Sequence, residues 1–198
     1  VLEKNGYVID VDNFIWNKVC ACIKMMEDKG IEPVPISVNV SRMHVYQEKF
    51  TENLKNMAGE YGIDPKYIPL EITESAFTKE EGSLFKKVQS LQGYGFKFSM
   101  DDFGSGYSSL GMLKSERVDE VKIDKTFVDD IATDKGKVLL GNVIRMINEL
   151  GIDMIAEGVE TKEQADFLKE NGCMYAQDYY YKPMPIEEFA KLLENSAR

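Results

Sequence analysis

Acidic and amide side chains stand at the carboxyl ends of successive apolar segments in this 198-residue sequence. In a parallel α/β fold, groups at these strand ends share one rim of the sheet. Four carboxylates on one rim would repel each other unless divalent cations lay between them. None of the donors is Cys or His, and oxygen-only donors suit hard cations such as Mg2+ or Mn2+. The strand-end residues are Asn39, Glu71, Asp101, Asp102, Lys122, Asp124, Glu157, Glu160 and Gln177.

The adjacent pair Asp101 and Asp102 indicates more than one ion, because one carboxylate can bridge two cations while the other binds one. Two ions about 3.5–4 Å apart are the usual device for in-line displacement at a phosphodiester. Lys122 adds a positive charge that can orient water or stabilise developing negative charge. The pattern favours a metal-dependent enzyme of phosphoryl chemistry.

Each residue also has an ordinary structural explanation. A lone Asn39 or Glu71 at a strand end more often caps a helix or faces solvent, and an Asp pair is also typical of a turn or N-cap. Lys122 and Asp124 can form an ion pair, or Asp124 can cap the helix that follows. The joint pattern outweighs these explanations, because independent caps would not all fall at the same end of every strand.

The elements that must position these residues alternate along the chain. Short runs rich in Val and Ile are followed by longer segments with apolar residues at helical spacing, which predicts βα units and a parallel sheet. We expect strands over 34–40, 68–72, 96–100, 120–123, 153–156 and 174–177. We expect helices over 14–26, 50–57, 84–91, 138–150, 163–168 and 186–193. Glycine follows five helices, where it can adopt the left-handed conformation that ends a helix: Gly30, Gly62, Gly95, Gly151 and Gly172.

Six strands are compatible with an open six-stranded sheet or with a (β/α)8 barrel that lacks two strands. The strand-end residues favour the barrel. No linker or low-complexity segment interrupts the sequence, so we expect a single domain over residues 1–198. The sequence begins at Val1 without Met, which is typical of a piece of a longer chain.

Composition excludes several functions. A net charge of -10 repels phosphate backbones, so we expect no DNA partner. No apolar run approaches the roughly 18 residues of a membrane span, so we expect no membrane insertion. Three cysteines with a single histidine disfavour both a disulfide scaffold and a zinc site, and we expect Cys20, Cys22 and Cys173 to be small core residues.

A glycine- and serine-rich stretch follows the aspartate pair. Gly104 and Gly106 make it flexible, and serines such as Ser105 can satisfy backbone groups. We expect a mobile loop over a site; the alternative is an ordinary glycine turn capped by serine.

Several stretches then become specific to one family. They resemble, in order and in spacing, the EAL-domain cyclic-di-GMP phosphodiesterases, and the resemblance covers essentially the whole chain. They are Val38-Asn-Val-Ser41, Leu70-Glu-Ile-Thr-Glu-Ser75, Met100-Asp-Asp-Phe-Gly-Ser-Gly-Tyr-Ser-Ser-Leu110, Val121-Lys-Ile-Asp124, Ile155-Ala-Glu-Gly-Val-Glu-Thr161 and the segment from Gln177 to Pro185.

The resemblance implies a TIM-type (β/α)8 barrel, here missing the first one or two strands, and hydrolysis of cyclic di-GMP to linear pGpG with Mg2+ or Mn2+ at a two-ion site. It implies cytoplasmic bacterial signalling, regulatory domains in the parent chain, which can itself be membrane-anchored, and a homodimer. It implies these roles: Asn39, Glu71, Asp101 and Asp102 bind metal, Lys122 contacts the catalytic water, Glu157 binds or activates that water, Glu160 and Gln177 lie in the site, and Glu74 anchors the loop that begins at Phe103 and contains Ser105 and Gly106.

The sequence departs from the family in two places. The Glu-Ala-Leu motif, whose glutamate is a metal ligand, and the arginine shortly after it are absent, and Asp178 follows Gln177 where the family usually has glycine and a longer run before Lys-Pro. The alternative function is a catalytically inactive cyclic-di-GMP-binding or protein-interaction module of the same fold. An unrelated barrel that binds a sugar phosphate would need a basic or glycine-rich phosphate loop near the last strands, which the sequence lacks.

Overall fold

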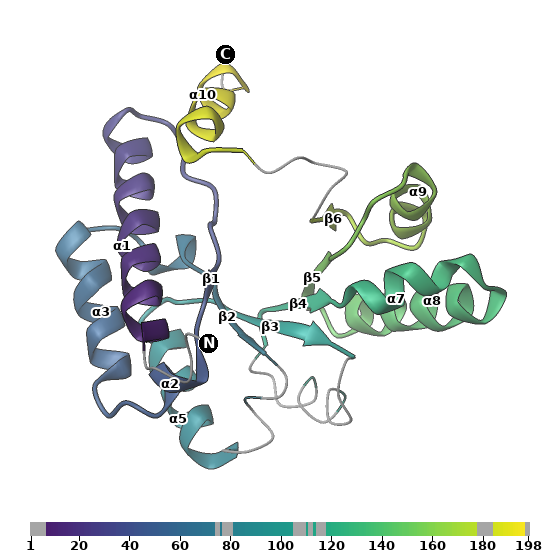
Figure 1. The fold of residues 1–198 in the computed structure, drawn as a ribbon, viewed down its shortest axis with the longest axis horizontal. Coiled ribbons are helices and arrows are strands. Elements are labelled where there is room, and N and C mark those ends of the chain that lie inside the picture. Colours follow the sequence, from purple (N-terminus) through teal and green to yellow (C-terminus); the bar gives the residue numbers. More distant parts are fainter. Residues whose placement is uncertain are drawn as a thin grey trace. The chain divides into compact units, whose positions relative to one another are not determined.

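A computed structural model of the chain describes residues 7–73, 76, 81–104, 110, 113, 118–177 and 184–196, in which strands and helices alternate (Figure 1). The strands are β1 (Val38–Asn39), β2 (Leu70–Thr73), β3 (Phe98–Phe103), β4 (Glu120–Ile123), β5 (Asp153–Ala156) and β6 (Tyr175–Ala176). The helices are α1 (Tyr7–Asp28), α2 (Arg42–Val45), α3 (Phe50–Tyr61), α5 (Glu81–Gln92), α7 (Lys125–Asp129), α8 (Asp134–Glu149), α9 (Lys162–Glu170) and α10 (Ile186–Ser196). Two 3-10 turns, η2 (Pro65–Tyr67) and η3 (Asp130–Ala132), join them.

The six strands form one sheet in the order β1-β2-β3-β4-β5-β6. The pairs β1–β2, β3–β4, β4–β5 and β5–β6 are parallel, which confirms the predicted βα architecture. Strands that follow one another in sequence order are also the arrangement around a (β/α) barrel. All five glycines predicted to end helices have positive φ, between 65° and 114°.

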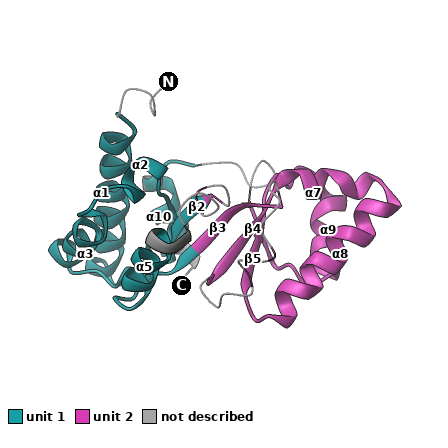
Figure 2. Ribbon diagram, turned by 90° about the horizontal axis from the view of Figure 1, so that it is seen from below, with its two compact units in different colours: residues 1–72, 79–98, 184–198 teal, residues 73–78, 99–183 magenta. Residues whose placement is uncertain are grey.

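The contacts divide the chain into two compact units (Figure 2). Unit 1 comprises residues 1–72, 79–98 and 184–198, and unit 2 comprises residues 73–78 and 99–183. The single domain expected from the sequence stays a prediction. None of the described helices is long and apolar enough to cross a membrane.

Unit 1 is built around α1, whose apolar residues pack against α3 and β1. Trp16, Ile23, Phe50 and Leu54 are almost completely buried there. A smaller apolar cluster of Cys22, Met26 and Ile31 packs against Phe189 and Leu193 of α10. This burial supports the interpretation of the Cys-x-Cys pair as core residues, and burial raises the pKa of the Cys20 thiol to about 11.

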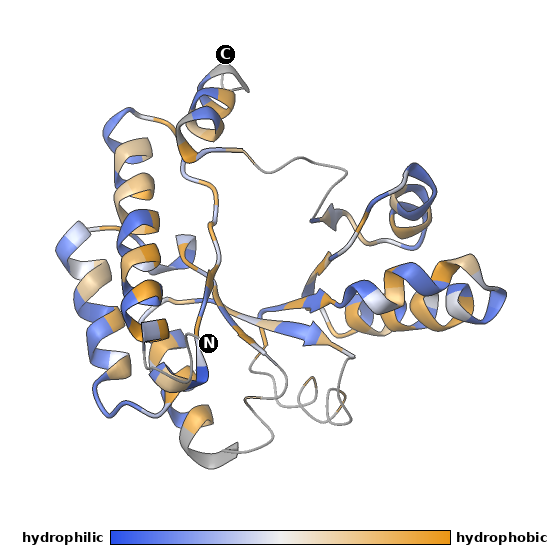
Figure 3. Cartoon of the chain, in the orientation of Figure 1, coloured by the Kyte–Doolittle hydropathy of each residue, from blue (hydrophilic) through white to orange (hydrophobic). Residues whose placement is uncertain are grey.

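Unit 2 places α7, α8 and α9 beside strands β4 to β6. The inner side of α8 carries Leu140, Ile144 and Ile147, which are fully buried, and polar residues cover much of its other side (Figure 3). The helices begin at side-chain caps: Asp124 accepts from the Thr126 amide at 2.9 Å, and Thr161 with Gln164 forms a capping box at α9. The Asp124 cap directly follows the last residue of β4, whereas the Thr161 cap closes the loop that connects β5 to α9.

Several predicted boundaries were wrong: β3 covers Phe98–Phe103 instead of 96–100, and α8 begins at Asp134 instead of 138. The differences at β1 and α1 have local explanations. β1 covers only Val38–Asn39 instead of 34–40, although the Ile36 and Val38 amides bond to Tyr67 and Pro69 carbonyls of the neighbouring segment. Prolines at positions 33 and 35 have no amide hydrogen, so the regular ladder starts after them. Helix α1 begins at Tyr7 rather than Phe14; its first turns carry exposed apolar residues such as Tyr7 and Val11, so they lack the buried apolar stripe by which the rest of the helix was predicted.

The carboxyl end of β1 is held by a buried polar network from α1 and α2. The Trp16 indole N–H donates to the Asn39 carbonyl at 3.0 Å, and its ring lies 4.3 Å from the ring of His44. The Ser41 amide donates to Asp12 Oδ2 at 3.3 Å, and the same oxygen lies 3.5 Å from His44 Nε2. His44 is 2% exposed, and this burial lowers its pKa although Asp12 opposes the shift.

We expect the stability of the protein to fall as the pH falls below about 6.5, and this loss to be smaller in His44→Gln. The pKa of His44 is lowered in the folded state from 6.5, so between the two values the unfolded chain binds the proton and the folded chain does not. The stabilisation is therefore complete above the unfolded pKa and is lost as the pH drops. Urea unfolding of both proteins at pH 7.5 and pH 5.5 measures it, and an identical pH dependence in the two would contradict it.

Candidate active site

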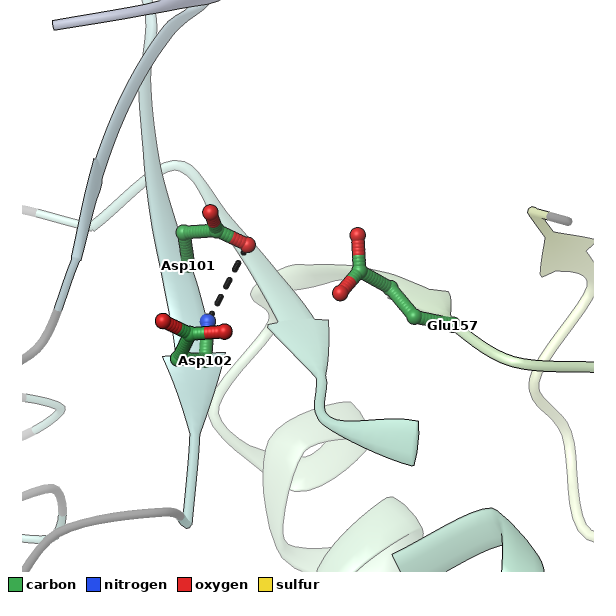
Figure 4. A group of neighbouring side chains, drawn as sticks. All are labelled: Asp101, Asp102 and Glu157. Atoms are coloured by element: carbon green, nitrogen blue, oxygen red, sulfur yellow. Dashed lines mark hydrogen bonds between the residues drawn. The ribbon is translucent and has the colours of Figure 1, made fainter. Parts of the chain in front are cut away.

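A bulge in β3 brings the two neighbouring aspartates together. The register between β3 and β4 shifts between Met100 and Phe103, and Asp102 has a φ of 57°, a left-handed conformation that is rare outside glycine. In a regular strand Asp101 and Asp102 would point to opposite faces of the sheet. The bulge instead lets the Asp102 amide donate to Asp101 Oδ1 at 3.0 Å, with both carboxylates on the same rim (Figure 4). Such a conformation costs on the order of 1–2 kcal/mol, which is typical of functional sites.

The strand end after this bulge is fixed by close packing. Gly104 has a φ of 95°, and a Cβ atom there would lie 1.9 Å from Cε2 of Phe127 on α7. The sequence interpretation gave Gly104 the role of a flexible residue. The structure shows that glycine is also required because the Phe127 ring lies directly against the backbone.

Three carboxylates form a cluster at the ends of β3 and β5. One oxygen from each of Asp101, Asp102 and Glu157 can be chosen so that all lie within 4.8 Å of one another, and all three residues are partly exposed. The carboxylates of Asp101 and Glu157 point toward one another, with Asp102 beside Asp101 (Figure 4). The structure thus unites three of the residues that the sequence singled out.

Lys122 on β4 lies against this cluster. Its Nζ atom is 2.6 Å from Glu157 Oε1 and 3.6 Å from Asp101 Oδ1, and the residue is 3% exposed. The anticipated alternative, a pair between Lys122 and Asp124, is not formed, because Asp124 caps α7. Three carboxylates and one ammonium group leave a net charge of -2, which is the charge that one divalent cation would balance.

The donor set of the cluster fits a divalent metal ion. Carboxylate oxygens are the preferred ligands of hard cations such as Mg2+ and Mn2+, and the partial exposure of all three residues leaves room for water. When bound there, such ions polarise phosphoryl oxygens and lower the pKa of water. Asp101 and Asp102 are the residues of unit 2 that would hold them, and Glu157 lies beside this pair.

In unit 1, Asn39 and Glu71 are brought side by side. They are register partners in the parallel pair β1–β2, and the Val40 amide donates to the Glu71 carbonyl at 2.9 Å. The Glu71 side chain is buried and accepts a hydrogen bond from Ser37 Oγ, while Asn39 is exposed. Sequence reasoning missed Ser37; the signal was its position two residues before Asn39, on the same face of the strand.

Glu160 and Gln177 follow strands β5 and β6, and the structure shows other contacts for each of them. The Gln177 amide donates to the Ala156 carbonyl at 2.9 Å, directly before Glu157, and its side chain is exposed. Glu160 bonds to Lys125 Nζ at 2.6 Å, a partner that the sequence did not reveal. The predicted residues Glu74, Ser105 and Gly106 lie outside the described residues, as does Asp178, the departure from the family pattern.

Comparison with known proteins identifies the family. The family model of the EAL domain matches residues 1–184. The chain belongs to the EAL domain family. It is 33% identical over 195 residues to the signaling protein YkoW of Bacillus subtilis, covering 98% of this chain and 24% of YkoW. It is 32% identical over 193 residues to the probable cyclic di-GMP phosphodiesterase PdeG of Escherichia coli, covering 96% of this chain and 38% of PdeG.

A solved EAL-domain structure has the same fold. The PaMucR phosphodiesterase in complex with c-di-GMP, a Pseudomonas aeruginosa protein, matches with a TM-score of 0.88 and 29% identity over 95% of this chain and 77% of that chain. The match confirms the TIM-type fold class and the family resemblance deduced from the motifs. The EAL-domain chain spans about a quarter of YkoW and less than two fifths of PdeG.

We expect Lys122→Met to destabilise the metal-free protein by roughly 1–3 kcal/mol, because the carboxylates of Asp101 and Glu157 would lose their buried cation. A divalent ion would replace part of the lost charge. The rise in melting temperature on adding Mn2+ should therefore be larger in the variant than in the wild type.

Lys162→Met is the matched control, because it removes the same charge from an exposed i,i+4 pair with Asp166. Such pairs contribute about 0–1 kcal/mol, so little change is expected. A variant at position 122 with wild-type stability and a wild-type response to Mn2+ would show that the three carboxylates do not depend on the lysine charge.

Proposed function

We propose that this EAL domain hydrolyses one phosphodiester bond of cyclic di-GMP, giving linear pGpG, in bacterial second-messenger signalling. The observation that carries the proposal is the cluster of Asp101, Asp102 and Glu157 around the buried Lys122. Two similar proteins support the proposal. PdeG is named a probable cyclic di-GMP phosphodiesterase, and the PaMucR phosphodiesterase was solved in complex with c-di-GMP. Oxygen ligands that can bind divalent cations, with a lysine that can stabilise negative charge, are typical of metal-dependent phosphodiester hydrolysis.

We propose that Asn39, Glu71, Asp101 and Asp102 are the metal ligands of a two-ion site for Mg2+ or Mn2+. Two observations support this assignment: Asn39 and Glu71 are register partners in β1–β2, and Asp101 and Asp102 have carboxylate oxygens within 4.8 Å of one another at the bulge in β3. Glu160 and Gln177 would line the edge of the site. Glu74 would anchor the loop that carries Ser105 and Gly106.

Glu157 is proposed as the general base. It would accept a proton from the attacking water as the water oxygen bonds to phosphorus, and the bond from phosphorus to the ribose 3′ oxygen breaks. The proton is then returned to the departing 3′ oxygen, directly or through solvent. Lys122, 2.6 Å from Glu157, would orient this carboxylate and stabilise negative charge that develops on the phosphoryl oxygens.

The domain organisation, cellular location and oligomeric state are proposed from the same family relationship. Residues 1–198 would act as one domain, joined in the full-length protein to regulatory domains, in a cytoplasmic setting and as a homodimer. That YkoW and PdeG are longer than the matched region supports the further domains.

The decisive test follows linear pGpG by chromatography after the full-length protein is mixed with cyclic di-GMP and Mn2+ or Mg2+. Steady product formation that a chelator abolishes would support the enzyme. Binding of cyclic di-GMP without turnover would indicate a binding module instead. Absence of both would contradict the functional relationship to PdeG and PaMucR.

We expect Glu157→Gln to lower kcat by about 10²–10⁴, because glutamine has nearly the same shape but cannot accept the proton. Cyclic di-GMP binding with Mn2+, measured by calorimetry, should stay within a few-fold of the wild type. Retained turnover would remove the general-base role from this carboxylate. Loss of binding together with turnover would show that Glu157 is mainly needed to hold the metal or substrate.

A further inference from the structure

The loop between β5 and α9 carries Glu157 at its start and Glu160 near its end. Its first amide, that of Glu157, donates to the Ile123 carbonyl at 3.0 Å. Near α9, the Glu160 and Thr161 amides both donate to Gln164 Oε1, at 2.8 and 2.9 Å. The backbone is therefore anchored at both ends of the loop, and Gly158 lies between these anchors.

Lys125 covers the middle of this loop. Gly158 has a φ of 70°, and a Cβ atom there would lie 2.2 Å from Cγ and 2.6 Å from Cβ of Lys125. The aliphatic stem of the lysine thus packs directly on the backbone that follows Glu157. Gly158 is buried in this contact, and any side chain at position 158 would force the loop or the lysine to move.

The ammonium group of Lys125 holds the far end of the same loop. Its Nζ atom lies 2.6 Å from Glu160 Oε1 and 3.5 Å from Asp129 Oδ1. The hydrogen bond with Glu160 raises the pKa of Lys125, so the group is a cation throughout the physiological range. Asp124, which caps α7, fixes the turn in which Lys125 is the first helical residue.

Two ion pairs therefore connect the β4–α7 segment to the β5–α9 loop, and in each segment the two charged residues are three positions apart. Lys122 at the end of β4 binds Glu157, and Lys125 at the start of α7 binds Glu160. Lys122 is buried among the carboxylates, whereas the Lys125 side chain is 44% exposed and lies outside the cluster. The second contact restrains the loop without adding charge to the cluster.

We propose that Lys125 is a positioning residue: by packing on Gly158 and binding Glu160 it holds the β5–α9 loop so that Glu157 faces Lys122 and the attacking water. The inference rests on the proposed function of Glu157. Glu160 then acts as the anchor of this loop. A displacement of about 1 Å at a catalytic group is enough to reduce turnover by up to 10²-fold.

The test compares the full-length wild type with Lys125→Met, Lys125→Arg and Lys162→Met. Methionine keeps an apolar stem over Gly158 but removes the cation, and arginine restores the cation. Lys162→Met is the matched control, because Lys162 forms an exposed pair with Asp166 within α9. Two readouts are used: steady-state hydrolysis of cyclic di-GMP with Mn2+, and hydrogen exchange of the peptide spanning residues 155–161 in metal-free protein.

We expect Lys125→Met to lower kcat about tenfold with KM within twofold, and to speed amide exchange in residues 157–160. Lys125→Arg should recover most of the kcat and the protection, and Lys162→Met should match the wild type in both readouts. A kcat within twofold of the wild type and unchanged exchange in Lys125→Met would overturn the proposal. A raised KM with unchanged kcat would also overturn it, because Lys125 would then bind substrate directly.

Failure of the proposed function gives a different result. If the wild type binds metal but forms no pGpG, hydrolysis is not the activity of this domain, while the exchange experiment still reports whether Lys125 restrains the loop. If Lys125→Met hydrolyses cyclic di-GMP normally in a protein whose wild type is active, only the positioning role is lost.

Discussion

Repulsion among Asp101, Asp102 and Glu157 is the constraint on which the site depends. Three carboxylates with oxygens within 4.8 Å of each other are unfavourable as neighbours unless cations balance them. Lys122 supplies one positive charge from inside the fold, at 2.6 Å from Glu157. One lysine against three carboxylates leaves the cluster with an excess of negative charge, which is the charge that a divalent cation would balance.

The surrounding structure keeps the lysine and the carboxylates of this cluster in place. Lys122 is buried and its cationic group cannot turn to solvent, so β4 must deliver it beside the carboxylates of β3 and β5. The bulge and the left-handed Asp102 give β3 two adjacent carboxylates on one rim, where a regular strand would give one. Two residues after Asp102, Gly104 packs tightly against the Phe127 ring, which fixes the strand end that follows the bulge.

The strand-end residues could be predicted from sequence because a parallel sheet puts the carboxyl ends of its strands at one rim. Asp101, Lys122 and Glu157 were identified in this way, and the five glycines that end helices were correct as well. Side-chain partners could not be predicted, because they depend on contacts between segments far apart in the chain. Ser37 with Glu71 and Lys125 with Glu160 are separated by 34 and 35 residues, and no local periodicity reports such pairs.

Lys122 and Lys125 show how burial decides the use of one residue type. The two side chains lie three residues apart and each binds a glutamate of the same loop at 2.6 Å. At Lys122, 4% side-chain exposure makes the charge strongly felt by its neighbours, so the residue governs the electrostatics of the cluster. At Lys125, solvent screens the charge. The main effect of this residue is steric, because its aliphatic stem packs on the backbone of Gly158. An ion pair at the surface contributes little to stability, but one at the end of a packed loop can still restrain the direction in which a carboxylate of that loop points.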